Sequence, residues 1–207
     1  MDMISGKILI AGKAVAEAEK ALIMLHGRGG SAEDILSLSK YLQIEGCTFL
    51  APQASGGSWY PYSFLAPKKN NEPWLTSSID LLGSIKKDLN DQGITTDRIY
   101  LLGFSQGACL ALEYAARFAE KYGGIAAFTG GLIGDIIYPE RYNGDFMATP
   151  VFIGTSDPDP HVPLARVEAT AEVYRKMNAE LTLKIYKNMG HTISDDEINT
   201  VNGLIFS

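Results

Sequence analysis

The sequence contains few cysteines, few histidines and no long apolar run. Among its 207 residues there are only two cysteines, Cys47 and Cys109, and three histidines. Two cysteines cannot build a disulfide framework or a cysteine-rich zinc site. No apolar run approaches the roughly 20 residues of a membrane-spanning helix, and the first residues lack the basic start and apolar stretch of a signal peptide. We therefore expect a cytoplasmic protein with no membrane insertion, no metal and no other cofactor.

Positive charge is also scarce. Lysine and arginine total 18 against 24 aspartates and glutamates, which gives a formal net charge of −6. A protein without a basic surface does not displace the counterions of a polyanion, so we exclude nucleic acid as a partner. Hydrophobic residues make up 46% of the chain and charged residues 20%, which is typical of a folded domain with one substantial core. We expect residues 1–207 to form a single domain.

Short branched apolar runs alternate with longer segments of helical period along most of the chain. This alternation is typical of an α/β protein with a mostly parallel sheet. The predicted strands are 8–10, 21–25, 48–50, 99–102, 125–128, 151–153 and 181–186, and the predicted helices are 33–44, 75–90, 106–122, 163–178 and 194–204. Roughly the first fifteen residues are predicted as a small hairpin that leads into the second strand. In such a sheet, functional residues gather at the carboxyl ends of the strands.

The segment Gly103-Phe104-Ser105-Gln106-Gly107 carries the pattern G-x-S-x-G directly after a predicted strand and directly before a predicted helix. A serine on so tight a turn has a strained backbone, and the two glycines let the strand and the helix approach each other. The hydroxyl then projects beside a helix N-terminus, whose dipole favours developing negative charge. We interpret Ser105 as a catalytic nucleophile. The alternative is an ordinary helix start with Ser105 as its N-cap.

A serine nucleophile needs a general base, and three histidines are available. Strand–turn–helix serine hydrolases carry their triad in the chain order serine, acid, histidine. His191 completes that order after the last predicted strand, and His161 is the alternative base. His26 lies before Ser105 and is interpreted as a structural residue. The acid must hold the tautomer of the histidine and stabilise its charged form. Two candidates follow the sixth predicted strand, Asp157 and Asp159.

Acyl transfer also needs two backbone N–H groups aimed at the developing oxyanion. Gln106, directly after the nucleophile, can supply one of them. The glycine-rich turn His26-Gly27-Arg28 follows a predicted strand and can supply the other from Arg28. A phosphate-binding loop is the rival interpretation of this turn, but the sequence lacks the Gly-Lys-Ser/Thr ending that a nucleotide-binding loop requires.

Residues 53–74 do not follow the α/β alternation and contain five aromatic residues among prolines and glycines. A loop of this length in a compact domain is usually functional or disordered, and its aromatic content argues against disorder. We predict that Trp59, Tyr60, Phe64 and Trp74 line an apolar substrate pocket. The alternative is an irregular loop whose aromatic side chains only hold it in place.

Taken in order, several motifs resemble the phospholipase/carboxylesterase family of α/β hydrolases, which includes the acyl-protein thioesterases. They are LHGRGG at 25–30, AP at 51–52 leading to SWY at 58–60, GFSQGA at 103–108, FTGGL at 128–132, PDPHVP at 158–163 and MGH at 189–191. The resemblance covers nearly the whole chain. It implies an α/β-hydrolase fold with a mostly parallel central sheet, helices on both faces and no large cap domain. It also implies a metal-independent serine hydrolase with Ser105 as nucleophile, His191 as base, and Arg28 and Gln106 as oxyanion donors.

The resemblance does not select the acid by itself, because the loop that carries it is longer here than the family pattern G-x-x-D-x-x-V-P. Gly154 and Val162 are eight positions apart, where the pattern has six. Counting forward from Gly154 selects Asp157, and counting back from Val162 selects Asp159. We favour Asp159, because the helix that begins near Val162 is expected to anchor the loop.

Together these residues predict a serine carboxylesterase that forms an acyl-enzyme on Ser105 and acts on small-molecule carboxylic esters, with thioesters left open. The alternatives are a lysophospholipase or an acyl-protein thioesterase and, outside enzymes, a catalytically silent small-molecule binding protein of the same fold. The aromatic loop differs from the loop that carries acyl chains in the thioesterase branch, which disfavours a protein-bound palmitoyl substrate. Homodimers are common among proteins of this kind, so we allow for one.

Overall fold

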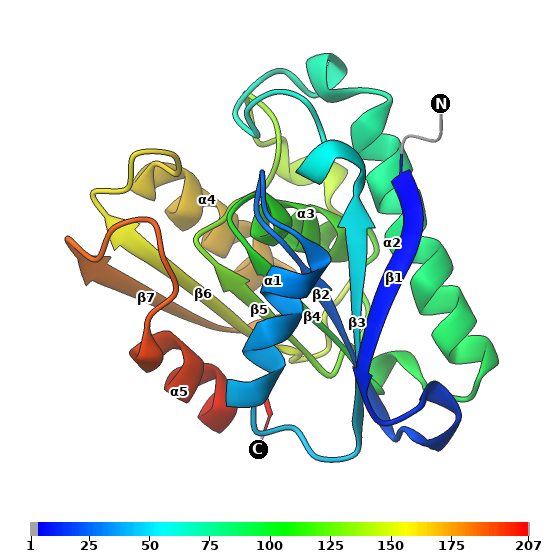
Figure 1. The fold of residues 1–207 in the computed structure, drawn as a ribbon. Coiled ribbons are helices and arrows are strands. Elements are labelled where there is room, and N and C mark those ends of the chain that lie inside the picture. Colours follow the sequence, from blue (N-terminus) through cyan, green and yellow to red (C-terminus); the bar gives the residue numbers. More distant parts are fainter. Residues whose placement is uncertain (1–3, 207) are drawn as a thin grey trace.

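The structure, a computed structural model, describes residues 4–206 and builds them around one central β-sheet (Figure 1). Its seven strands lie in the order β1-β3-β2-β4-β5-β6-β7. They are β1 (Ile4–Gly12), β2 (Lys20–Leu25), β3 (Cys47–Ala54), β4 (Ile99–Phe104), β5 (Gly124–Phe128), β6 (Pro150–Asp157) and β7 (Glu180–Lys187). Every neighbouring pair is parallel except β1 with β3. The prediction of a mostly parallel sheet is therefore confirmed.

Helices cover both faces of this sheet, as predicted. They are α1 (Ala32–Leu36), α2 (Trp74–Asp91), α3 (Gln106–Arg117), α4 (Leu164–Lys176) and α5 (Asp195–Leu204). The shorter 3-10 turns are η1 (Val15–Glu17), η2 (Ser37–Tyr41), η3 (Ser55–Gly57), η4 (Lys68–Asn71), η5 (Thr96–Arg98) and η6 (Pro139–Arg141). In Figure 1, α1 and α5 lie in front of the sheet, and α3 and α4 lie behind it. Within residues 4–206, no segment forms a large cap over the sheet.

Two apolar clusters, one on each face, hold the layers together. One joins the sheet to α2, α3 and α4 and includes Leu82, Leu112 and Val167, while the other joins it to α1 and α5 and includes Ile35 and Val201. The central strands are buried on both faces, which explains why they read as unbroken apolar runs rather than as alternating patterns. Among the helices within the described residues, none is both long and apolar enough to cross a membrane.

The N-terminal hairpin is a wrong prediction. Residues 4–12 form one strand, β1, which pairs with β3 instead of folding back on itself. This antiparallel pairing covers the edge of β3 that would otherwise expose unpaired backbone groups. Two helices are also shorter than predicted: α1 gives way after Leu36 to the 3-10 turn η2, and α3 ends at Arg117. Ser31 is the N-cap of α1 and forms a reciprocal capping box with Asp34.

The parallel strands bring several distant segments to one edge of the sheet. The segment between β3 and α2, residues 55–73, forms what we call the pocket loop and lies at the top of Figure 1. The turns that follow β2 and β4, and the loops that follow β6 and β7, lie at the same edge because the four strands are parallel. These segments carry the residues singled out from the sequence.

Candidate active site

Ser105 lies on the turn between β4 and α3 in a backbone conformation that L-residues rarely adopt, with φ of 54° and ψ of −116°. The flanking glycines permit this turn. A Cβ at Gly103 would overlap the backbone of Gly107, and a Cβ at Gly107 would overlap the carbonyl oxygen of Leu25. Because backbone atoms cannot turn aside, only glycine fits at both positions. The Ser105 backbone N–H donates to the carbonyl of Phe128 at 2.9 Å, which helps to hold the strained residue.

His191 lies directly against this serine. Its Nε2 is 2.8 Å from the Ser105 Oγ. The ring follows β7 on a loop in which Gly190 has a φ of +84°, a conformation that glycine adopts at little cost. The Gly190 N–H donates to the hydroxyl of Ser156 at 3.0 Å, which ties the loop to β6. The ring of Phe104 packs against the imidazole, with centroids 5.2 Å apart.

Of the two candidate acids, the structure brings Asp159 to His191. The Asp159 Oδ2 is 2.8 Å from the His191 Nδ1, and its Oδ1 accepts the backbone N–H groups of His161 and Val162, each at 2.8 Å. The carboxylate is fully buried. Asp157 is exposed at the end of β6, and within the described residues its side chain makes no hydrogen bond or ion pair with His191.

Burial would raise the pKa of the Asp159 carboxyl, but the hydrogen bonds from His191 and from the two backbone N–H groups outweigh it and lower that pKa. Asp159 is therefore ionised near neutral pH and can only accept hydrogen bonds. The proton between Asp159 and His191 then resides on Nδ1. This leaves Nε2 as the acceptor for the Ser105 hydroxyl, which is the tautomer that a general base requires.

Arg28 and Gln106 lie where the sequence predicted oxyanion donors. Arg28 follows β2, and Gln106 is the first residue of α3. Within residues 4–206, no backbone acceptor pairs with the N–H of either residue. His26 has the structural position expected of it. Its Nδ1 is 2.7 Å from the carbonyl oxygen of Gly27, its Nε2 accepts the N–H of Ala54 at 3.2 Å, and burial lowers its pKa.

A cavity of about 670 Å³ opens beside the Ser105 hydroxyl. Two predicted aromatics, Tyr60 and Phe64, contribute to its wall, and the exposed Tyr62 lies between them in the chain. The full lining comprises Gly27, Arg28, Tyr60, Pro61, Tyr62, Ser63, Phe64, Phe104, Ser105, Gln106, Cys109, His161, Val162 and His191. Within the described residues this lining contains no carboxylate, and most of it is apolar or aromatic.

Trp59 and Trp74 differ from the prediction, because neither belongs to this lining. Trp59 is 2% exposed and points into the core, where its indole N–H donates to the carbonyl of His26 at 2.8 Å. An indole N–H needs such a partner when it is buried. Trp74 begins α2 and is 41% exposed. The pocket loop thus combines both interpretations of its aromatics, since some line the cavity and one holds the loop in place.

Sequence reasoning considered His161 only as an alternative base and missed Ser156. The exposed ring of His161 lies edge-on to His191, with centroids 4.9 Å apart, and borders the cavity. Ser156 accepts from Gly190 and donates to the carbonyl of Pro158 at 3.1 Å, so it links the loop that carries Asp159 to the loop that carries His191. A histidine beside the acid in PDPHVP was a visible signal for the first. Nothing in the sequence marks the second.

A family model described as Phospholipase/Carboxylesterase matches residues 9–205. The crystal structure of a phospholipase/carboxylesterase from Dyadobacter fermentans is 50% identical, covers 100% of this chain and 99% of its own, and superposes with a TM-score of 0.97. The carboxylesterase of Bacillus cereus is 19% identical, with a TM-score of 0.77 over 98% of this chain and 93% of its own. These likenesses confirm the predicted α/β-hydrolase fold.

Curated sequences point in the same direction. Acyl-protein thioesterase 1 of Saccharomyces cerevisiae is 28% identical over 214 residues, which cover 92% of this chain and 93% of the yeast protein. The probable carboxylesterase SOBER1-like of Arabidopsis thaliana is 24% identical and covers 87% of this chain and 76% of its own.

Proposed function

The chain belongs to the phospholipase/carboxylesterase family, and on that premise we propose that it is a serine hydrolase that cleaves carboxylic esters through an acyl-enzyme on Ser105. One observation carries this proposal. The Ser105 hydroxyl, the His191 ring and the Asp159 carboxylate form a continuous row with separations of 2.8 Å and 2.8 Å. Ser105 lies at the N-terminus of α3, and Ser105 and His191 border the cavity.

In the first half of the reaction, the Ser105 Oγ attacks the acyl carbonyl carbon and transfers its proton to the His191 Nε2. The Asp159 carboxylate stabilises the resulting imidazolium through its bond to Nδ1. The former carbonyl oxygen, now negative, accepts the backbone N–H groups of Arg28 and Gln106, and the helix dipole of α3 adds to their field. His191 then returns the proton to the departing alcohol or thiol as the bond to the acyl carbon breaks.

In the second half, a water molecule replaces the leaving group. His191 takes a proton from this water, the hydroxide attacks the acyl-enzyme carbonyl, and the same two N–H groups hold the second oxyanion. Collapse of this intermediate breaks the bond to the Ser105 Oγ, which recovers its proton from His191. The free acid leaves and the starting row is restored.

The cavity favours small, partly apolar esters. Its wall includes Tyr60, Phe64, Phe104 and Val162, which offer apolar surface close to the nucleophile. The runner-up is an acyl-protein thioesterase, favoured by the similarity to the yeast protein of that name. Both chemistries use the same acyl-enzyme, so the acyl group and the leaving group separate the two.

Hydrolysis of nitrophenyl esters from acetyl to palmitoyl tests the proposal, with Ser105→Ala as the control. We expect turnover that is greatest for short chains and absent in the variant. A long-chain optimum would favour a lipid or acyl-protein substrate, and a parallel series of acyl thioesters would then rank the two leaving groups. No turnover at any length, together with no labelling by a fluorophosphonate, would leave a binding protein of the same fold.

A further inference from the structure

The side chain of Arg28 holds the pocket loop. Its Nη1 donates to the Ser58 hydroxyl and to the carbonyl of Pro61, each at 2.9 Å. Its Nη2 donates to the carbonyls of Tyr60 at 2.9 Å and Tyr62 at 2.6 Å. All four terminal N–H groups of the guanidinium are therefore committed to four residues of the segment 58–62 of this loop. The planar donor fork of arginine suits such convergent binding, and a lysine ammonium offers only three donors.

The side chain of Gln106 also binds the segment 58–62 of the pocket loop. Gln106 is 6% exposed, its Nε2 donates to the carbonyl of Tyr60 at 2.8 Å, and its Oε1 accepts the N–H of Trp59 at 3.0 Å. The Ser58 hydroxyl also donates to the carbonyl of Tyr60, at 2.8 Å. That one carbonyl oxygen thus accepts hydrogen bonds from three side chains, two of which belong to the residues proposed as oxyanion donors.

We propose that the side chains of Arg28 and Gln106 are positioning residues that couple the substrate-binding wall at Tyr60 to the backbone N–H groups of the oxyanion hole. The inference rests on the proposed function. A substrate held against Tyr60 presses on the segment around this residue. The hydrogen bonds of that segment come from the side chains of Arg28 and Gln106, and the backbone N–H groups of the same two residues must receive the oxyanion. Filling of the pocket therefore aligns both N–H groups, and a loose Tyr60 segment misaligns them.

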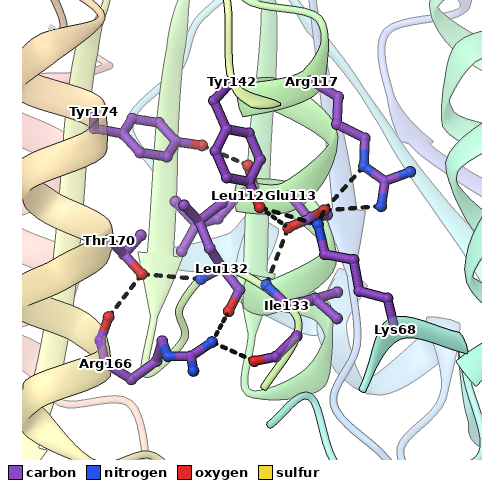
Figure 2. A network of polar contacts seen from close by, with 11 residues as sticks. Lys68, Leu112, Glu113, Arg117, Leu132, Ile133, Tyr142, Arg166, Thr170 and Tyr174 are labelled. Atoms are coloured by element: carbon purple, nitrogen blue, oxygen red, sulfur yellow. Dashed lines mark hydrogen bonds and ion pairs between the residues drawn. The ribbon is translucent and has the colours of Figure 1, made fainter. Parts of the chain in front are cut away.

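The far end of the pocket loop offers a matched control, because it is anchored without either residue. Lys68 forms a 2.6 Å ion pair with Glu113 on α3, a fully buried carboxylate that also binds Arg117, the hydroxyl of Tyr142 and the N–H of Ile133. Figure 2 shows these contacts converging on Glu113. Loss of Lys68 would loosen the loop and leave Glu113 with its other partners, while the bonds from Arg28 and Gln106 to the Tyr60 segment remain.

The test compares Gln106→Met, Arg28→Met, Arg28→Lys and Lys68→Met in steady-state hydrolysis of short-chain nitrophenyl esters. For Gln106→Met and Arg28→Met we expect kcat to fall about 10- to 100-fold with KM within about twofold, since misplacement of reacting groups acts on the transition state. Arg28→Lys should recover part of the kcat. Lys68→Met should raise KM and leave kcat unchanged. Affinity for a trifluoromethyl ketone, whose serine adduct carries an oxyanion, should fall in proportion to kcat/KM.

Two outcomes overturn the inference. One is a kcat equal to that of the wild type in both methionine variants, and the other is a change confined to KM, as in Lys68→Met. Thermal unfolding of each variant shows whether it is folded, and Gln106→Met stands in if Arg28→Met does not fold. Wild-type protein that fails to hydrolyse any ester would instead overturn the proposed function.

Discussion

Replacement of Asp159 by asparagine should nearly abolish turnover without disturbing the pocket. Both carboxylate oxygens are acceptors here: Oδ1 receives the N–H groups of His161 and Val162, and Oδ2 lies 2.8 Å from the His191 Nδ1. An asparagine has one acceptor oxygen and one NH₂ group. The oxygen must face the two backbone donors, because an NH₂ group cannot accept them, and the NH₂ group then faces His191.

That arrangement exchanges the hydrogen-bonding roles of the two ring nitrogens of His191. The His191 Nδ1 would have to accept a hydrogen bond from the amide, which moves the ring proton to Nε2 and leaves no base for Ser105. In a serine triad this wrong tautomer lowers kcat about 10⁴-fold, which corresponds to about 5.4 kcal/mol of transition-state stabilisation. KM should change little, since neither Asp159 nor its amide substitute borders the cavity.

Nitrophenyl ester hydrolysis with active-site titration measures this effect, and Asp157→Asn is the matched control. Asp157 is exposed, so its variant should retain the kcat of the wild type. Full turnover in Asp159→Asn together with a large loss in Asp157→Asn would refute the reasoning and exchange the roles of the two carboxylates.

Four further predictions concern stability and thiol reactivity. Hydrogen bonds lower the pKa of the Asp159 carboxyl below its ordinary value in the folded state, so its contribution to stability is present above the ordinary pKa of an aspartate and is lost as the pH falls through the lowered pKa. The difference in unfolding free energy between wild type and Asp159→Asn should therefore narrow as the pH falls from about 5 to about 2 in denaturant titrations, and a constant difference would contradict this. Gly107→Ala should lose about 1–3 kcal/mol or fail to fold, because the new Cβ would overlap the backbone of β2. By contrast, Gly83→Ala on α2 meets open space and should gain roughly 0.5–1 kcal/mol in the same unfolding assay. Burial raises the pKa of both Cys47 and Cys109 to about 12. Neither thiol should therefore react with an aromatic disulfide at pH 8 until the protein unfolds, and rapid labelling of the folded protein would contradict the buried positions of the two thiols.

The serine turn was predictable because its requirements are local. The strained residue, the glycines on either side, the preceding strand and the following helix all lie within a few positions of Ser105. The sheet was predictable for a related reason, since strands buried on both faces appear as unbroken apolar runs. The pairing of β1 was not, because its partner β3 lies some distance away in the chain and the local pattern fits a hairpin equally well.

The choice of acid depended on the path of one loop. Counting from Gly154 and from Val162 gave different answers, and both aspartates are of the right type. The structure shows Asp159 accepting the N–H groups two and three residues ahead of it, a local arrangement that aspartate favours in turns. That preference was present in the sequence and supports the count from Val162.

Side-chain direction in the pocket loop was beyond the reach of the sequence. Composition marks a loop rich in aromatics but does not say that Trp59 faces the core while Tyr60 borders the cavity. The hydrogen bonds from the Arg28 and Gln106 side chains to the pocket loop could not be predicted either, because they join residues from separate parts of the chain. Only the burial of Glu113 is indicated by the sequence, because it is the single carboxylate within the apolar helix α3.

The central claim is that Ser105 carries the acyl group, and mass spectrometry after rapid acid quench tests it most directly. Wild-type protein mixed with nitrophenyl acetate should show the mass of one added acetyl group, located on the peptide that contains Ser105 and released as turnover proceeds. Ser105→Ala should remain unmodified under the same conditions. An acetyl group found on another residue, or steady turnover by Ser105→Ala, would contradict the account.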